Sequence, residues 1–150
     1  MDKNGKYHGE GHLKDVDGSL YKGQFKNGFK NGIGEFIWPD GSKYVGNFFD
    51  DKANGHGELI LSSGSRYVGG FNGDLPYGSG ELSLADGTWY KGKFKNGVKT
   101  GRGELGKPDG TKYIGTFKRD LYHGVGELIT ANGTFFKGEF KYPFFKTEKT

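Results

Sequence analysis

A 23-residue period runs through the chain and constrains its fold more than any other feature. Glycine pairs of the form Gly-x-Gly begin 23 residues apart, at Gly9, Gly32, Gly55, Gly78, Gly101 and Gly124. An aromatic residue follows the same period, at Tyr21, Tyr44, Tyr67, Tyr90, Tyr113 and Phe136. Six copies without any insertion indicate a repeat protein in which each unit packs on its neighbours.

The composition separates this chain from disordered glycine-rich sequences. It has 30 glycines in 150 residues, well above the usual share of about 7%, but its aromatic content of 16% is more than disordered segments carry. The absence of cysteine excludes disulfides and thiolate metal sites, and it is consistent with a reducing compartment. The first residues show no signal-peptide pattern, and no apolar run approaches the ~20 residues that span a bilayer.

One unit, from Gly32 to Phe48, predicts a β-hairpin. Side chains alternate between the two faces of a strand, so Phe36 shares a face with the glycines around it. The segment Pro39-Asp40-Gly41-Ser42 predicts a tight turn, because Pro fixes φ and Gly accepts a positive φ. After the turn, Tyr44 and Phe48 return to the face of Phe36. The glycines allow a ring to lie flat across the neighbouring strand, because no Cβ stands there.

The predicted fold class is all-β, an elongated, twisted, single-layer antiparallel sheet of consecutive β-hairpins with an aromatic groove on one face. The polar segment from Phe49 to Gly55 is expected to be a longer connection between hairpins. Residues 142–150 would form an aromatic cap on the last sheet edge, or alternatively a dimerisation edge. Residues 1–141 would contain six hairpin units, near 9–31, 32–54, 55–77, 78–100, 101–123 and 124–141.

The series YKGKFKNGVKTGRGEL, from Tyr90 to Leu105, resembles the MORN (membrane occupation and recognition nexus) repeat. The resemblance covers residues 5 to 140 and recurs six times. It implies a sheet of hairpins that acts in scaffolding, self-association, attachment to cytoskeleton or cilium, or membrane-linked assembly. MORN arrays also occur as appendages of lipid kinases and methyltransferases, but nothing in this chain resembles their catalytic parts. The resemblance therefore implies a non-enzymatic cytoplasmic protein with cytoskeletal, ciliary or membrane association.

The aromatic face is the first candidate site. Its groove would accept an amphipathic helix or an extended peptide of a protein partner. The alternative is that these rings only form the core. The predicted groove residues are Phe36, Tyr44, Phe48, Leu59, Tyr67, Phe71, Leu82, Tyr90 and Phe94.

The opposite, outer face of repeats two and three is the second candidate site. Polar residues are expected there, but alternation places six apolar residues on it: Ile33, Ile37, Val45, Phe49, Ile60 and Val68. Such an outer apolar patch would recruit a protein or a second copy of the chain, as a homodimer. The alternative is that β-branched residues stand there for their strand propensity alone.

Three lysines on the outer face of one strand, Lys91, Lys93 and Lys95, form the third candidate site. They would bind the headgroups of anionic phospholipids at a membrane surface. The alternative is a solvated face on which they pair with Glu81 and Glu104.

The sequence contains no motif for catalysis, cofactors or metals. No helical pattern follows the Gly-x-Gly pairs, so they do not predict nucleotide loops, and the four histidines lack metal-ligand spacing. Because the repeat uses the aromatic residues and the net charge is only +4, no nucleic-acid partner is expected. A protein-interaction scaffold is the preferred function. The alternatives are a peripheral membrane adaptor and a regulatory module of a larger enzyme.

Overall fold

The computed structural model describes residues 5–141 and 144–146, and the chain divides into two compact units, Met1–Leu75 and Pro76–Thr150. The strands of the first unit are β1 (Gly9–Lys14), β2 (Leu20–Lys26), β3 (Phe29–Ile37), β4 (Lys43–Phe49), β5 (Lys52–Ile60) and β6 (Arg66–Asn72). From the boundary onward they are β7 (Leu75–Ser83), β8 (Trp89–Lys95), β9 (Val98–Gly106), β10 (Lys112–Lys118), β11 (Leu121–Ile129), β12 (Phe135–Lys141) and β13 (Phe144–Lys146).

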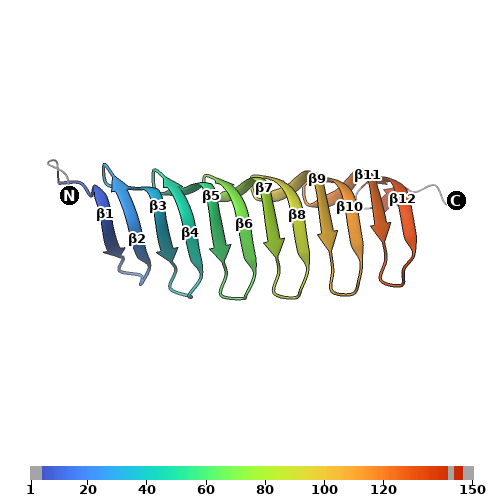
Figure 1. Cartoon of the computed structure of the whole chain (residues 1–150), viewed down its shortest axis with the longest axis horizontal. Coiled ribbons are helices and arrows are strands. Elements are labelled where there is room, and N and C mark those ends of the chain that lie inside the picture. Colours follow the sequence, from blue (N-terminus) through green and yellow to red (C-terminus); the bar gives the residue numbers. More distant parts are fainter. Residues whose placement is uncertain (1–4, 142–143, 147–150) are drawn as a thin grey trace. The chain divides into compact units, whose positions relative to one another are not determined.

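Within each unit, every strand pairs antiparallel with the strand that follows it in the sequence (Figure 1). Strands β3 and β4, for example, pair from Gly32 opposite Phe48 to Ile37 opposite Lys43. The described residues contain no helix. The predicted all-β class and the succession of antiparallel hairpins are therefore confirmed.

The turn between β3 and β4 follows the predicted Pro-Asp-Gly chemistry. In the loop after β3, the amide of Gly41 donates to the carbonyl of Trp38 at 3.0 Å, and Gly41 has a φ of 90°. The carboxylate of Asp40 accepts the amide of Ser42 at 2.8 Å. This bond lowers the pKa of Asp40 because it stabilises the ionised form.

The connection between hairpins is shorter than the sequence predicted. Strand β4 ends at Phe49 and β5 begins at Lys52, so only Asp50 and Asp51 lie between them. Their φ values of 46° and 72° are typical of the type I′ turn, which matches the twist of paired strands. The loop prediction was wrong because aspartate tolerates the left-handed conformation. Here Asp51 also accepts the amide of Lys30 at 2.7 Å, which adds a bond to the turn.

In the hairpins of Tyr21, Tyr44, Tyr90 and Tyr113 the core is the tyrosine itself, which lies across a glycine of the next strand. The sixth hairpin has Phe136 at this position. A Cβ added to Gly34 would stand 2.5 Å from Cε1 of Tyr21, and one added to Gly57 would stand 2.5 Å from Cε1 of Tyr44. Both tyrosines are buried. As predicted, the ring occupies this position because the strand below it carries no side chain there.

Tyr44 illustrates how these rings are held. Its hydroxyl donates to the carbonyl of Asn47 at 2.8 Å. Its ring meets the edges of Phe48, at 5.0 Å between centroids, and of Phe71 from the next hairpin, at 4.9 Å. Such edge contacts stabilise pairs of rings by about 0.5–1.5 kcal/mol beyond their buried area. The contact between Tyr44 and Phe71 also packs one hairpin of the unit against the next.

The predicted C-terminal cap falls partly on residues that the structure does not describe. Strand β13 pairs with β12 from Lys141 opposite Phe144 to Glu139 opposite Lys146. Residues 142–143 and 147–150 of the predicted tail lie outside the described residues. The choice between a cap and a dimerisation edge stays a prediction.

Replacement of Gly57 by alanine is expected to destabilise the first unit by about 3 kcal/mol, because the new Cβ would displace the buried ring of Tyr44. Urea unfolding measures this loss. The matched control is Gly11→Ala, at the same repeat position in β1, where the nearest atom to a new Cβ is Cε2 of Phe25 at 3.4 Å. The control should change the free energy of unfolding by less than about 1 kcal/mol. Equal effects of the two substitutions would contradict the role assigned to the tyrosine ring.

Alkaline pH is expected to destabilise the protein between pH 10 and pH 12. Burial raises the pKa from the ordinary 10.0 to about 12 at four tyrosines: Tyr21, Tyr44, Tyr67 and Tyr90. In this interval the unfolded chain releases phenolic protons that the folded chain keeps, so the free energy of unfolding falls as the pH rises. Below pH 10 both states keep these protons and the contribution is constant. Urea unfolding over a pH series measures the fall, and an unchanged free energy up to pH 12 would disprove it.

Candidate functional site

A groove of about 750 Å³ opens on the aromatic face of the first unit, between residues of β3 to β6 and their turns. The buried rings of Tyr44, Phe48 and Phe71 line it. More accessible apolar side chains line it as well: Phe36, Trp38, Leu59 and Leu61. Its volume lies within the range of about 300–1,000 Å³ that is usual for ligand sites.

The groove lies where one column of the repeat has its smallest side chain. The column consists of residues 23 apart: Tyr7, Lys30, Ala53, Pro76, Lys99 and Tyr122. In the fifth repeat Tyr122 stacks on Tyr113, with 4.0 Å between ring centroids and 11° between ring planes. At the corresponding place in the second repeat, Ala53 provides only a methyl group beside Tyr44. This small side chain leaves the space that the groove occupies.

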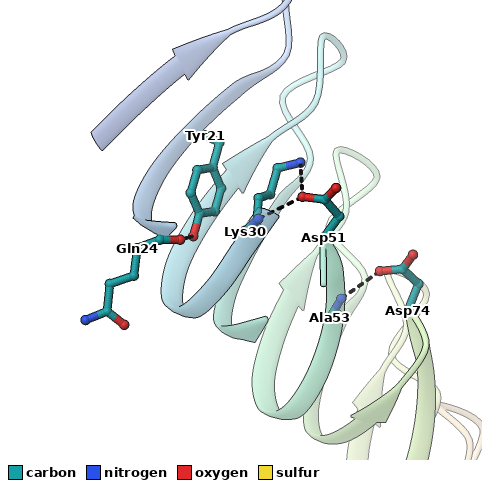
Figure 2. A network of polar contacts seen from close by, with 6 residues as sticks. All are labelled: Tyr21, Gln24, Lys30, Asp51, Ala53 and Asp74. Carbon is teal, nitrogen blue, oxygen red and sulfur yellow. Dashed lines mark hydrogen bonds and ion pairs between the residues drawn. The ribbon is translucent and has the colours of Figure 1, made fainter. Parts of the chain in front are cut away.

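Lys30 of the same column points into the aromatic face. Its Nζ lies 5.6 Å from the ring centroid of Tyr21 and 5.3 Å from that of Phe36, and its side chain is only 16% exposed. The carboxylate of Asp51 balances this charge, since its Oδ1 lies 3.8 Å from Nζ and also accepts the amide of Lys30 (Figure 2). The ammonium is thus held between aromatic rings and a carboxylate.

Carboxylates outnumber ammonium groups around the groove. Asp74 accepts the amide of Ala53 at 2.8 Å (Figure 2), and Asp40 accepts the amide of Ser42. With Asp51, three carboxylates line the groove together with one ammonium, that of Lys30. The groove is therefore locally acidic, although the whole chain has a net charge of +4. This arrangement favours a ligand that brings positive charge.

The structure separates the predicted groove residues into core and surface. Phe36, Tyr44, Phe48, Leu59 and Phe71 line the groove. The remaining predicted residues do not line it: Tyr67, Leu82, Tyr90 and Phe94. The tyrosine and phenylalanine columns are almost fully buried, with exposed fractions of 0–7%. A ligand would therefore meet mainly Phe36, Leu59 and their accessible neighbours.

Sequence reasoning missed several residues of the groove, namely Lys30, Trp38, Asp51, Ala53, Leu61 and Asp74. Trp38, whose ring centroid lies 4.9 Å from that of Phe36, was not assigned to the site. Asp51 was not found because its segment, Phe49 to Gly55, was interpreted as a longer connection between hairpins. A comparison of side-chain size down the column of Ala53 is the signal that would have located the groove.

The outer apolar patch lies on β3 to β6. Ile33 and Phe49 are its most accessible members, with exposed fractions of 57% and 58%, and Ile37, Val45, Ile60 and Val68 are half-buried. Glutamates interrupt the patch, since Val45 stands opposite both Glu35 and Glu58 in the sheet. The patch is thus divided by charged side chains.

Two of the three predicted lipid-binding lysines have polar partners on β7. Lys91 lies 3.8 Å from the carboxylate of Glu81, and the ammonium of Lys93 donates to the hydroxyl of Ser79 at 2.7 Å. Lys95 is exposed. Because Lys91 stands opposite both Glu81 and Glu104 in the sheet, the net attraction of these lysines for an anionic surface is reduced.

Other kinds of site receive no support from the described part of the chain. Residues 5–141 and 144–146 contain no group of three or more His, Asp or Glu side chains that would hold a metal ion. None of these residues belongs to a helix long and apolar enough to cross a membrane.

A comparison with solved structures finds the SAS-4 (dCPAP) TCP domain of Drosophila melanogaster, in complex with a proline-rich motif of Ana2 (dSTIL). The match has a TM-score of 0.51 and 11% sequence identity, and covers 86% of this chain and 70% of that chain. At this identity the likeness concerns the fold alone. A comparison with curated proteins gives no match.

A comparison with family models identifies the repeat itself. The MORN repeat model matches six consecutive segments, at residues 3–20, 21–43, 44–66, 67–89, 90–112 and 113–135. Five of the six have the 23-residue length of the sequence period. The matches leave only the first two and the last fifteen positions uncovered, and with the hairpin structure they show that the chain belongs to the MORN repeat family.

Proposed function

We propose that this chain is a non-enzymatic interaction scaffold whose groove binds a segment of a partner polypeptide. The observation that carries the proposal is the apolar groove of about 750 Å³ in the first unit. MORN repeats are interaction modules, which is consistent with a binding role rather than a catalytic one.

The construction of the groove supports binding without rearrangement. Its base is fixed, because Tyr44 is buried, hydrogen-bonded to Asn47 and packed against two phenylalanine rings. Its sides offer accessible apolar surface, with Trp38 and Leu61 exposed by 37% and 42%. Exposed apolar side chains above a rigid base are typical of peptide grooves that bind an amphipathic helix or an extended segment.

The charged side chains that line the groove indicate which residues a partner segment should carry. Asp40, Asp51 and Asp74 line the groove with only Lys30 to offset them, so a partner segment with basic residues beside an apolar anchor is favoured. The SAS-4 TCP domain, which has a similar antiparallel sheet, was solved with a proline-rich motif of Ana2. That complex supports the general idea that an open sheet of this kind binds a peptide.

The cellular setting rests on the family resemblance alone. We propose a cytoplasmic protein that is linked to cytoskeletal, ciliary or membrane-associated assemblies. Lipid binding through Lys91, Lys93 and Lys95 is less favoured, because Lys91 and Lys93 already have partners on the neighbouring strand.

Self-association through the outer apolar patch is a second candidate function. The exposed side chains of Ile33 and Phe49 favour it, since apolar groups of this size are usually covered when they cluster. The glutamates that divide the patch weaken it. The groove therefore remains the first choice for a partner.

The double substitution Trp38→Ala with Leu61→Ser tests the groove. Peptides selected from a random display library on the full chain serve as probes, and their affinity is measured by fluorescence polarisation. We expect the double variant to weaken binding by about tenfold or more, because each truncated apolar contact is worth roughly 1 kcal/mol or more. Both side chains are partly exposed, so the fold should persist.

The matched control is Ile33→Ser with Phe49→Ser on the outer face. These substitutions remove similar apolar area and should leave peptide affinity unchanged. The reverse pattern, with binding lost only in the control, would assign the partner to the outer apolar patch. A library that yields no binder would overturn the proposed function.

A further inference from the structure

The structure contains the same three-residue arrangement twice, once in each unit. In the first, the ammonium of Lys30 lies over the ring of Tyr21 and 3.8 Å from Asp51. In the second, at the same repeat positions, Lys99 lies 5.5 Å from the ring centroid of Tyr90 and 3.6 Å from Asp120. In both, the aspartate also accepts the amide of its lysine, at 2.7 Å. A ring and a carboxylate thus hold one lysine ammonium in each copy.

A third copy lacks only the lysine. Tyr44, Ala53 and Asp74 occupy the positions of Tyr21, Lys30 and Asp51. Asp74 accepts the amide of Ala53 at 2.8 Å, as Asp51 accepts that of Lys30 (Figure 2). The ring and the carboxylate are therefore in place, but the side chain between them ends at Cβ.

The missing side chain coincides with the groove. Tyr44, Ala53 and Asp74 all line it, and Asp74 is close enough to Tyr44 to raise the pKa of its hydroxyl electrostatically, after the larger effect of burial. Figure 2 shows the carboxylate of Asp74 bonded to the Ala53 amide, as the carboxylate of Asp51 is bonded to the Lys30 amide. The space has the ring and carboxylate that hold an ammonium elsewhere in this same chain.

We propose that this space binds the side chain of a lysine from a partner polypeptide, whose ammonium takes the place that Lys30 and Lys99 fill in their own repeats. The inference rests on the proposed function, since it names the residue of the bound segment that the groove recognises. The methylene stem of the lysine would lie along Phe36 and Leu59, which line the same groove. The ammonium would meet Asp74 and the ring of Tyr44.

The substitution Ala53→Lys tests the proposal by filling the space from within. The variant should fold, because the repeats of Lys30 and Lys99 already hold a lysine at this position. We expect it to weaken the binding of library-selected peptides by about tenfold or more, because its own ammonium occupies the site. Asn54→Lys is the matched control, since it adds the same charge one residue away, on the opposite face of β5, and should leave affinity unchanged.

Two further measurements identify the ligand group. Replacement of the peptide lysine by norleucine removes the ammonium and keeps the stem, and should weaken binding by about fivefold to tenfold. The variant Asp74→Asn keeps an acceptor for the Ala53 amide but removes the charge, and should weaken the lysine peptide and not the norleucine peptide. In the Ala53→Lys variant, the lysine and norleucine peptides should bind equally.

The outcomes separate this inference from the proposed function. Binding that is lost with Trp38→Ala and Leu61→Ser, but is unaffected by norleucine and by Ala53→Lys, would leave the groove as a peptide site and overturn the assignment of a lysine. Peptides that bind with equal affinity to the wild type and to both groove variants would overturn the groove and the lysine site together.

Discussion

A tyrosine that lies across the glycines of the next strand is the contact on which the repeated core depends. The ring fills the space that side chains of the paired strand would otherwise take, and its hydroxyl satisfies a backbone carbonyl, as Tyr44 does for Asn47. A single-layer sheet has no opposing layer to cover its apolar face, so the rings of successive hairpins cover one another instead. Glycine and tyrosine are therefore linked requirements, and this link explains why both follow one period.

The tyrosine and glycine positions are nearly the same in every repeat, so the repeats differ from one another mainly at positions outside this core. The column of Tyr7, Lys30, Ala53, Pro76, Lys99 and Tyr122 varies in size and charge while the tyrosines beside it do not. Lys30 and Lys99 lie over the rings of Tyr21 and Tyr90, and Tyr122 stacks on Tyr113. At the same position Ala53 lines the groove beside Tyr44.

The sequence predicted the architecture well, because the architecture depends on strict periodicity. The hairpins, their turn at Asp40 and Gly41, and the close approach of Tyr44 to Gly57 all follow from residue type and spacing. The two-residue turn at Asp50 and Asp51 did not, because aspartates in left-handed conformation resemble loop residues until their acceptor bonds are seen. The groove lies on the face that alternation assigns to Phe36, Tyr44 and Phe48, but most rings of that face are buried. Alternation gives the face of a side chain and not its exposure.

The aspartates of the two-residue turns each connect one hairpin to the one before it in the sequence. Asp51, Asp74 and Asp120 each accept an amide that lies 21 residues earlier in the chain, so the polar groups of one hairpin are completed by the hairpin that is synthesised after it. Addition or removal of one whole repeat keeps each such donor beside an acceptor of the following hairpin. A shorter segment added within a strand would shift the register of the pairing and separate them.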